Sequence, residues 1–337
     1  MTPVRINMAL QGGGAHGAFT WGVLDRILED DRLEIAAISG TSAGALNGAA
    51  VKAGLARGSR ALARETLERI WTDVGALTDE RLAPWLAAFS PLAVSHLIGM
   101  SPLYQAADGF SRSVSPYVTG GINENALRGI VSSLDFDMVC SEAGPQFHIC
   151  ATNVRNGKIK LFTGAAIGVE AILASACLPT LFPAVEIDGE FYWDGGYTGN
   201  PALYPLFDAE LPRDILIVNI NPLERPEVPV TARDIQNRIN EISFNTSLLR
   251  ELRAIEFVQR LVRGGKIPAG AMKDVLVHMI ADDTLMRQLS VATKAVPNPI
   301  VMAQLRAAGH RAADAFLETT FDSLGRTSSI SLEDMFG

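Results

Sequence analysis

A serine placed between two glycines is the feature of this sequence best suited to chemistry. Gly40-Thr41-Ser42-Ala43-Gly44 follows a short apolar run at 35–39 and precedes residues that are compatible with a helix. The G-x-S-x-G pattern at a strand-to-helix turn is typical of a nucleophile elbow, which exposes the serine oxygen. The positive end of the helix dipole favours negative charge there. We expect Ser42 to be a nucleophile, with an ordinary Gly/Ser turn as the alternative.

A second glycine-rich loop, Gly12-Gly13-Gly14-Ala15-His16-Gly17, also joins an apolar run to a helical pattern. As a dinucleotide fingerprint it should be followed by a strand that ends in Asp or Glu. The next expected strand ends instead in the Ser42 turn. As an oxyanion loop, its backbone N–H groups would stabilise a developing negative charge by roughly 3 kcal/mol per donor. We favour an oxyanion loop made by Gly12, Gly13 and Gly14 over nucleotide binding.

A nucleophilic serine needs a base, which is usually a histidine held by a carboxylate. None of the five histidines lies in a late loop of the kind that supplies a triad histidine; they are His16, His96, His148, His278 and His310. The other candidate is Asp194, which follows an expected strand and precedes Gly195 and Gly196. A carboxylate there can reach a serine directly, although Asp-Gly-Gly taken alone is more often a hairpin turn.

The elements that must position these residues alternate along the chain. A run at 6–10 leads into the first glycine loop, helical spacing follows, and the run at 35–39 leads into the Ser42 turn. Strand, turn and helix in this order predict an α/β fold with a mainly parallel sheet and helices on its faces. Further strands are expected at 147–152, 158–162, 186–193, 215–220 and 275–280, and further helices at 43–56, 59–74, 125–133, 231–263 and 299–320.

Composition narrows the classes of function. Of the 337 residues, 48% are hydrophobic and 20% are charged, which suits one large or two modest globular domains. The formal net charge is −8, so we expect no nucleic-acid partner and only a local, apolar membrane contact. The three cysteines lie in apolar runs, which indicates reduced thiols, a cytoplasmic compartment and no cysteine metal site; they are Cys140, Cys150 and Cys177. The first eight residues lack the pattern of a signal peptide.

Two apolar segments have the composition to contact lipid. Residues 82–100 are uncharged over a long stretch, but Pro84, Pro91 and other breakers argue against a transmembrane helix. This segment is a candidate lid or acyl-chain wall, and burial or a subunit contact is the more common outcome. Residues 231–263 combine isoleucines with arginines, as in helices that lie on membranes. We favour a helix that packs on the domain instead.

These segments together resemble the patatin-like phospholipase family. Gly12 to Gly17 is similar to its oxyanion loop, the Ser42 turn to its nucleophile elbow, and Asp194-Gly195-Gly196 to its catalytic aspartate motif. Ala174-Ser175-Ala176-Cys177-Leu178-Pro179 is similar to a further A-S-x-x-x-P segment. The resemblance covers about residues 6–206. His16 departs from it, because the family often has Lys or Arg at this place, and the charge near the loop then depends on the pKa of a histidine.

The resemblance implies a three-layer αβα fold and a serine acyl hydrolase of the phospholipase A or lysophospholipase type. It implies a Ser42–Asp194 dyad, an acyl-serine intermediate, an oxyanion hole at Gly12, Gly13 and Gly14, and support from Gly17, Gly40, Gly44, Gly195 and Gly196, with no cofactor or metal. An acyltransferase, or an esterase for another hydrophobic ester, is the close alternative, and a nucleotide-binding oxidoreductase the distant one. The expected partners are a lipid or hydrophobic ester and a peripheral membrane contact, while the oligomeric state stays open.

We expect a catalytic core at 5–206, an α/β and helical part at 207–327 packed on it, and a flexible tail at 328–337. The core carries every motif named above. The C-terminal part carries none that we can assign.

Overall fold

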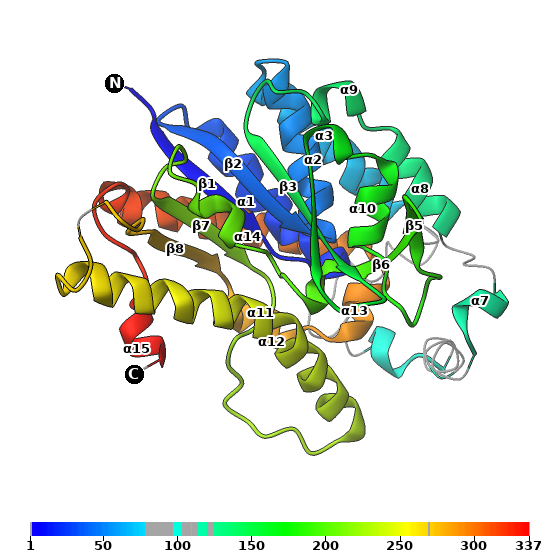
Figure 1. Ribbon diagram of the computed structural model, residues 1–337. Helices are drawn as coiled ribbons and strands as arrows, with labels where there is room; N and C mark the ends of the chain where they lie inside the picture. The colour runs from blue at the N-terminus through cyan, green and yellow to red at the C-terminus, as the bar shows by residue number, and fades with distance from the viewer. Residues whose placement is uncertain are drawn as a thin grey trace.

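The computed structural model describes residues 2–77, 97–102, 109, 114–119, 124–268 and 270–336. In this part of the chain, an eight-stranded sheet runs through the centre of the molecule (Figure 1). Its strands are β1 (Val4–Leu10), β2 (Leu33–Thr41), β3 (Gln146–Asn153), β4 (Ile159–Thr163), β5 (Val185–Ile187), β6 (Glu190–Asp194), β7 (Asp214–Asn219) and β8 (Leu276–Ala281).

The strand order is β5-β6-β3-β2-β1-β7-β8, and β4 also pairs with β3. Strands β3, β2, β1, β7 and β8 are parallel to their neighbours in that series. β4 and β6 pair with β3 in the antiparallel sense, and β5 pairs with β6 in the same way. The carboxyl ends of β1 and β2 therefore lie side by side, which is where α/β sheets usually hold their sites.

Helices cover both faces of the sheet, as Figure 1 shows. One face packs against α1 (Gly17–Glu29), α2 (Ala43–Ala56), α3 (Arg60–Gly75) and α14 (Pro299–Thr320), and the other packs against α11 (Ala232–Arg263) and α15 (Leu332–Phe336). Alternate residues of β7 point to opposite faces of the sheet. Leu216 and Val218 pack in the core under α1, α2, α3 and α14 (the first core), while Ile215 and Ile217 pack in the core under α11 and α15 (the second core). A strand buried on both faces needs this continuous apolar run. The predicted three-layer αβα fold is confirmed.

Short helices and turns complete the chain. They are α7 (Pro116–Thr119), α8 (Glu124–Ser132), α9 (Phe136–Val139), α10 (Val169–Ser175), α12 (Asp283–Gln288), α13 (Val291–Ala295), and the 3-10 turns η1 (Gly14–His16), η3 (Gly164–Ala166), η4 (Gly195–Tyr197), η5 (Tyr204–Phe207) and η6 (Phe321–Ser323). The single strand expected at 186–193 is instead the hairpin of β5 and β6. Asp188 and Gly189 both have positive φ, of 53° and 77°, which is what a tight hairpin turn requires.

The C-terminal third continues the same sheet and closes its helical layer. β7 pairs with β1, β8 pairs with β7, and α14 packs tightly on α1. A Cβ on Gly309 of α14 would lie 2.0 Å from the carbonyl oxygen of Phe19, so only glycine permits this approach. The expected flexible tail also differs from the structure. Ser329 N donates to Val277 O, and Leu332 is buried against the second core.

The segment at 82–100 falls mostly on 82–96, which lie outside the described residues. Residues 97–100 are helical, with Leu97 and Met100 exposed and Ile98 packed against the core. In the described ranges, no helix combines the length and the apolar character needed to span a bilayer.

Candidate active site

Ser42 lies at the turn between β2 and α2, with its residue 8% exposed. Its φ of 54° and ψ of −120° place a residue that has a side chain in a conformation that such residues rarely adopt. Hydrogen bonds hold this conformation: Ser42 N donates to Ser175 Oγ over 2.8 Å, and Ser175 Oγ donates to Cys150 O over 2.6 Å. The A-S-x-x-x-P segment therefore supports the elbow through Ser175.

The turn needs glycine because it packs against the end of β1. A Cβ on Gly44 would lie 2.1 Å from Leu10 O, and a Cβ on Gly40 would lie 2.5 Å from Gly44 O. Real Cβ atoms do not approach backbone oxygens so closely. These two glycines of the expected elbow allow α2 to begin directly beside β1.

The first glycine loop lies against the serine. A Cβ on Gly12 would come within 2.8 Å of the Cβ of Ser42. Gly12 N donates to Asn200 Oδ1 over 2.6 Å, so this N–H is already used. In the described part of the chain, the N–H groups of Gly13 and Gly14 have no acceptor. Of the three expected oxyanion donors, the structure thus leaves two available.

Asp194 ends β6 and is 1% exposed. Its Oδ1 accepts a hydrogen bond from Gly196 N over 2.7 Å, and its carboxyl lies close enough to Ser42 for that hydroxyl to lower its pKa. Burial raises the pKa of Asp194 to about 7, although the N–H of Gly196 and the hydroxyl of Ser42 oppose that rise. A carboxyl with a pKa near neutrality can accept a proton and return it, as a general base and acid must.

Strand β2 and the turn after Asp194 are joined by side-chain hydrogen bonds. Thr41 Oγ1 donates to Gly199 O and Ser39 Oγ donates to Ala202 O, each over 2.6 Å. On the other side, Asp194 N donates to Cys177 O over 2.8 Å. The relative position of Ser42 and Asp194 is therefore fixed by hydrogen bonds that do not use the Ser42 hydroxyl.

His16 is buried within the glycine loop, and its ring bonds to Thr293 and not to Ser42 or Asp194. Its Nε2 lies 2.8 Å from Thr293 Oγ1, whose own hydrogen is donated to Ser290 O, so Nε2 carries the ring proton. Burial, and then the nearby Lys294, hold the pKa of His16 well below its usual value. His16 is neutral near pH 7, so the expected titration of this histidine near neutrality is not what the structure shows.

The other described histidines have no hydrogen bond to Ser42 or Asp194. His278 bonds to Asp214 over 2.9 Å, at the beginning of β7, and His310 lies on α14 beside Glu29. His148 is half-buried in β3, where burial lowers its pKa. His96 lies outside the described residues.

A group of buried amides, which sequence reasoning missed, holds the glycine loop. Gln11 Oε1 accepts hydrogen bonds from Ile220 N, Asn221 N and Asn221 Nδ2, at 2.9 to 3.1 Å. Gln11 Nε2 donates to Asn200 O and to Asn245 Oδ1, both over 3.2 Å. These residues lie far apart in the chain and follow no motif, although Asn200 comes six residues after Asp194.

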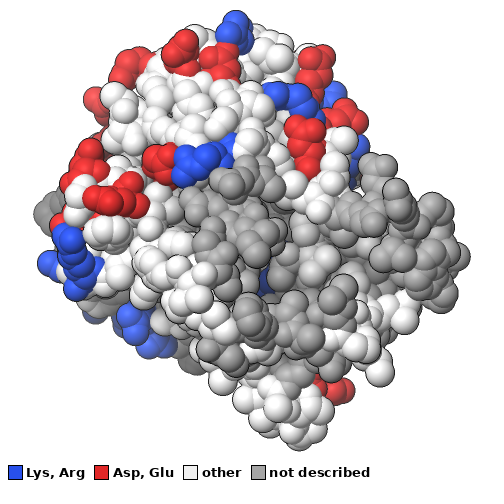
Figure 2. All heavy atoms as spheres, turned by 90° about the vertical axis from the view of Figure 1, so that its right-hand side faces the viewer, with Lys and Arg blue, Asp and Glu red and all other residues white. Residues whose placement is uncertain are grey.

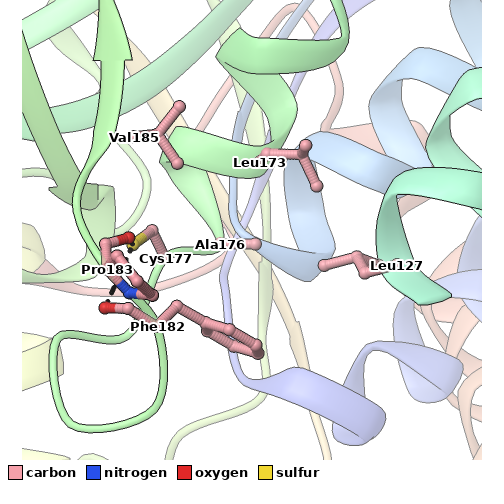
Figure 3. A pocket seen from close by; sticks show the side chains of 7 residues that line it. All are labelled: Leu127, Leu173, Ala176, Cys177, Phe182, Pro183 and Val185. Atoms are coloured by element: carbon pink, nitrogen blue, oxygen red, sulfur yellow. Dashed lines mark hydrogen bonds between the residues drawn. The ribbon is translucent and has the colours of Figure 1, made fainter. Parts of the chain in front are cut away.

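An apolar pocket adjoins the elbow support (Figure 3). It is lined by Leu127, Leu173, Ala176, Cys177, Phe182, Pro183 and Val185, from α8, α10, the loop that follows α10, and β5. Ala176 directly follows Ser175, and Cys177 O accepts the hydrogen bond from Asp194 N. The pocket therefore includes Cys177, which holds the backbone of Asp194, and the residue next to Ser175, which holds the backbone of Ser42.

The face seen in Figure 2 is hollowed near its centre, and a Lys or Arg side chain lies at the bottom of the hollow. Most charged residues in this view lie on the upper part of the face, and the described surface around the hollow is largely uncharged.

A protein-family model described as patatin-like phospholipase matches residues 8–207. The chain belongs to the patatin-like phospholipase family. The matched range contains the glycine loop, the Ser42 elbow and Asp194, so the resemblance expected from these motifs is confirmed. A patatin-like phospholipase is a lipid ester hydrolase, which displaces the oxidoreductase interpretation of the glycine loop.

Solved structures similar to this patatin-like phospholipase come from bacterial proteins. VipD from Legionella pneumophila is 13% identical, with a TM-score of 0.46, and the match covers 94% of this chain and 67% of VipD. A chain of the ExoU–SpcU complex of the Pseudomonas aeruginosa type III secretion system is 19% identical, with a TM-score of 0.32 and coverage of 95% and 62%. No curated protein sequence gives a significant match.

Proposed function

We propose that the protein is a serine acyl hydrolase that cleaves lipid esters with Ser42 as nucleophile and Asp194 as base. The observation that supports this proposal is a convergence: Ser42 sits on a strained turn against the glycine loop, and the buried carboxyl of Asp194 lies close enough to Ser42 for that hydroxyl to lower its pKa. Nucleophile and base within hydrogen-bond reach are the signature of covalent catalysis.

The proposed reaction has two steps. Asp194 takes the proton of Ser42 while Oγ bonds to the ester carbonyl carbon, and the N–H groups of Gly13 and Gly14 donate to the oxyanion. The carbon–oxygen bond of the ester then breaks, and Asp194 returns the proton to the leaving alkoxide. In the second step, Asp194 takes a proton from water, the hydroxide attacks acyl-Ser42, and the fatty acid leaves as Ser42 regains its proton. Preorganised backbone donors of this kind contribute about 3 kcal/mol each.

The substrate class follows from the family, whose model describes a phospholipase. The apolar pocket beside Ser175 and Cys177 has a free volume of about 10 Å³, which is about the room of one water, so it does not itself hold an acyl chain. The proposed substrate is a phospholipid or lysophospholipid with its ester carbonyl at Ser42.

A peripheral membrane contact through the first half of α11 belongs to the same proposal. Ile235, Ile239 and Ile242 are exposed on this helix, and Val228 and Val230 are exposed just before it. Figure 1 shows this part of α11 and the preceding loop extending below the sheet. Exposed apolar side chains on a projecting element favour insertion into the headgroup region of a bilayer.

The test is covalent labelling with a long-chain alkyl fluorophosphonate, followed by intact-mass analysis. We expect one adduct on the wild type, none on Ser42→Ala, and much slower labelling of Asp194→Asn. Ser141→Ala is the matched control, because Ser141 Oγ only donates to Met138 O, and it should label like the wild type. An adduct that survives in Ser42→Ala would remove Ser42 from the mechanism.

A further inference from the structure

Two residues beyond the family match bond to each other, and one of them bonds to the glycine loop. Lys294 Nζ, on α13, donates to Asn221 Oδ1 over 2.6 Å. Asn221 Nδ2, from the segment after β7, donates to Gly12 O over 2.9 Å. α13 also touches the loop directly, because a Cβ on Gly14 would lie 2.3 Å from Lys294 O.

The orientation of the Asn221 amide is determined by its neighbours. Gln11 Oε1 accepts from two backbone N–H groups, so Gln11 presents its oxygen on this side. Asn221 must therefore turn Nδ2 toward Gln11 Oε1 and Gly12 O, and Oδ1 toward the ammonium group of Lys294. The series therefore runs from donor to acceptor in one sense: Lys294 donates to Asn221, and Asn221 donates to Gly12 O.

The series ends on the oxyanion donor, because Gly12 C=O and Gly13 N–H belong to one peptide group. A carbonyl that accepts a hydrogen bond polarises its own peptide, and hydrogen bonds in a chain strengthen one another. A charged donor at the start increases the effect. We propose that Lys294 is a positioning residue that acts through Asn221 to polarise the Gly12–Gly13 peptide and so strengthens the Gly13 N–H toward the oxyanion. This rests on the proposed serine mechanism.

The charges that surround Lys294 leave its ammonium available to Asn221. In the described part of the chain, its only hydrogen bond is the one to Asn221. Glu241 of α11 is the acidic group that acts on it, but both carboxylate oxygens of Glu241 bond to Arg225. His16 faces it from the loop in the neutral form.

The same surroundings give Lys294 a titration in the working pH range. The residue as a whole is half-buried, but its ammonium group is enclosed by protein. This burial lowers the pKa of Lys294 to about 8, with Arg225 lowering it further and Glu241 opposing both. The positive charge that polarises the peptide should therefore be lost as the pH rises through about 8.

The experiment measures kcat and KM for p-nitrophenyl butyrate, an uncharged ester, from about pH 6 to about pH 10. We compare Lys294→Met and Lys294→Arg with the wild type. Lys273→Met is the matched control, because Lys273 is also partly buried and donates to the backbone oxygens of Leu206 and Asp208.

We expect Lys294→Met to lower kcat about tenfold at pH 7 and to change KM less than twofold, because only the transition state carries the oxyanion. Lys294→Arg should keep most of the rate at pH 7 and move the alkaline fall of kcat to higher pH. Lys273→Met should leave both parameters unchanged.

Three results would overturn the proposal. The first is an unchanged kcat in Lys294→Met. The second is a loss confined to an anionic phosphatidylglycerol substrate and expressed in KM, which would mean that Lys294 contacts the headgroup directly. The third is a fall of kcat at alkaline pH that stays at the same pH in Lys294→Arg. If Lys294→Met fails to fold, the pH profile of Lys294→Arg alone tests the proposal. Each of these leaves fluorophosphonate labelling of wild-type Ser42 intact, whereas failure of the serine mechanism abolishes that labelling.

Discussion

The family-matched part and the C-terminal part contribute to the candidate site in different ways. Residues 8–207 contain Ser42, Asp194 and the glycine loop, which are the groups that would touch the reacting ester. Residues after 207 provide groups that support the loop, chiefly Asn221, which donates to Gly12 O, and Lys294, which donates to Asn221. The first set can be recognised from local motifs because each motif encodes a sharp turn. The second set holds that turn in place and has no local pattern.

The largest effect should come from the residue that bonds to the substrate. Replacing Ser42 by Ala removes the nucleophile and should lower kcat for a phospholipid at least about 10³-fold. The fold should persist, since alanine leaves the Ser42 N to Ser175 Oγ bond in place. Circular dichroism and steady-state hydrolysis check both statements together. Activity within tenfold of the wild type would show that the matched part does not supply the nucleophile.

Gly12 offers a direct comparison of the two parts, because a side chain from each part bonds to it. Asn200 accepts its N–H within the matched range, and Asn221 donates to its carbonyl from beyond that range. Either residue changed to Ala leaves a buried polar group unpaired, which costs about 1–3 kcal/mol of stability. We expect kcat to fall by about tenfold to a hundredfold in each variant.

Thermal unfolding and kcat for p-nitrophenyl butyrate measure these two effects. Asn156→Ala is the control, since Asn156 lies in an exposed turn and its Oδ1 accepts only from Lys158 N. If Asn200→Ala impaired kcat and Asn221→Ala did not, the C-terminal part would contribute packing alone.

Most of the fold could be predicted from the sequence because strands that are buried on both faces appear as continuous runs of apolar residues. The runs at 6–10, 35–39 and 215–220 correspond closely to β1, β2 and β7. The hairpin within 186–193 was missed, although Asp188-Gly189 is a known hairpin signal. The flexible tail expected at 328–337 rests on the lack of strong periodicity at the chain end, a pattern that does not reveal the burial of Leu332 against the second core.

The candidate site was predictable only where chemistry and turn geometry coincide. Glycine is required at Gly12 and Gly44 by approaches of less than 3 Å to other atoms, and this requirement produces the visible motifs. Asn221 and Lys294 face no such limit on their backbone. Their roles depend on which strand lies beside β1, and that is a property of the folded sheet.

Because the pKa of Asp194 is raised by burial, activity and stability should depend on pH in opposite ways. Its carboxylate must be ionised to act as a base, so kcat should rise as the pH increases through about 7. In the unfolded chain the group ionises near pH 3.8. The folded state therefore favours the protonated form, and the stability this contributes is complete below about pH 3.8 and is lost as the pH rises toward about 7.

Replacing Asp194 by Asn should remove this cost while retaining a similar shape. We expect the variant to have a higher melting temperature than the wild type at pH 8 and a similar one at pH 4, with activity nearly abolished at both. The upper limit of the gain at pH 8 is about 4 kcal/mol, from roughly 1.4 kcal/mol per pKa unit. Calorimetry at the two pH values checks this, and an equal change at both would mean that Asp194 does not titrate as described.

The smallest expected effect concerns α11, whose two halves differ in the exposure of their apolar side chains although the sequence predicts one amphipathic helix. Leu252 and Ile255 are buried against the sheet, whereas Ile239 is 53% exposed and Ile242 is 52% exposed. Changing Ile239 and Ile242 together to Gln should weaken sedimentation with phosphatidylcholine vesicles about threefold to tenfold, since each buried apolar side chain contributes roughly 1 kcal/mol at a bilayer interface. Hydrolysis of dissolved p-nitrophenyl butyrate should not change.

Leu252→Gln is the control in the buried half of α11. It should lower the melting temperature, because it buries an unpaired amide, and should leave vesicle binding unchanged. Equal vesicle binding by the wild type and the double variant would place any membrane contact elsewhere on the molecule.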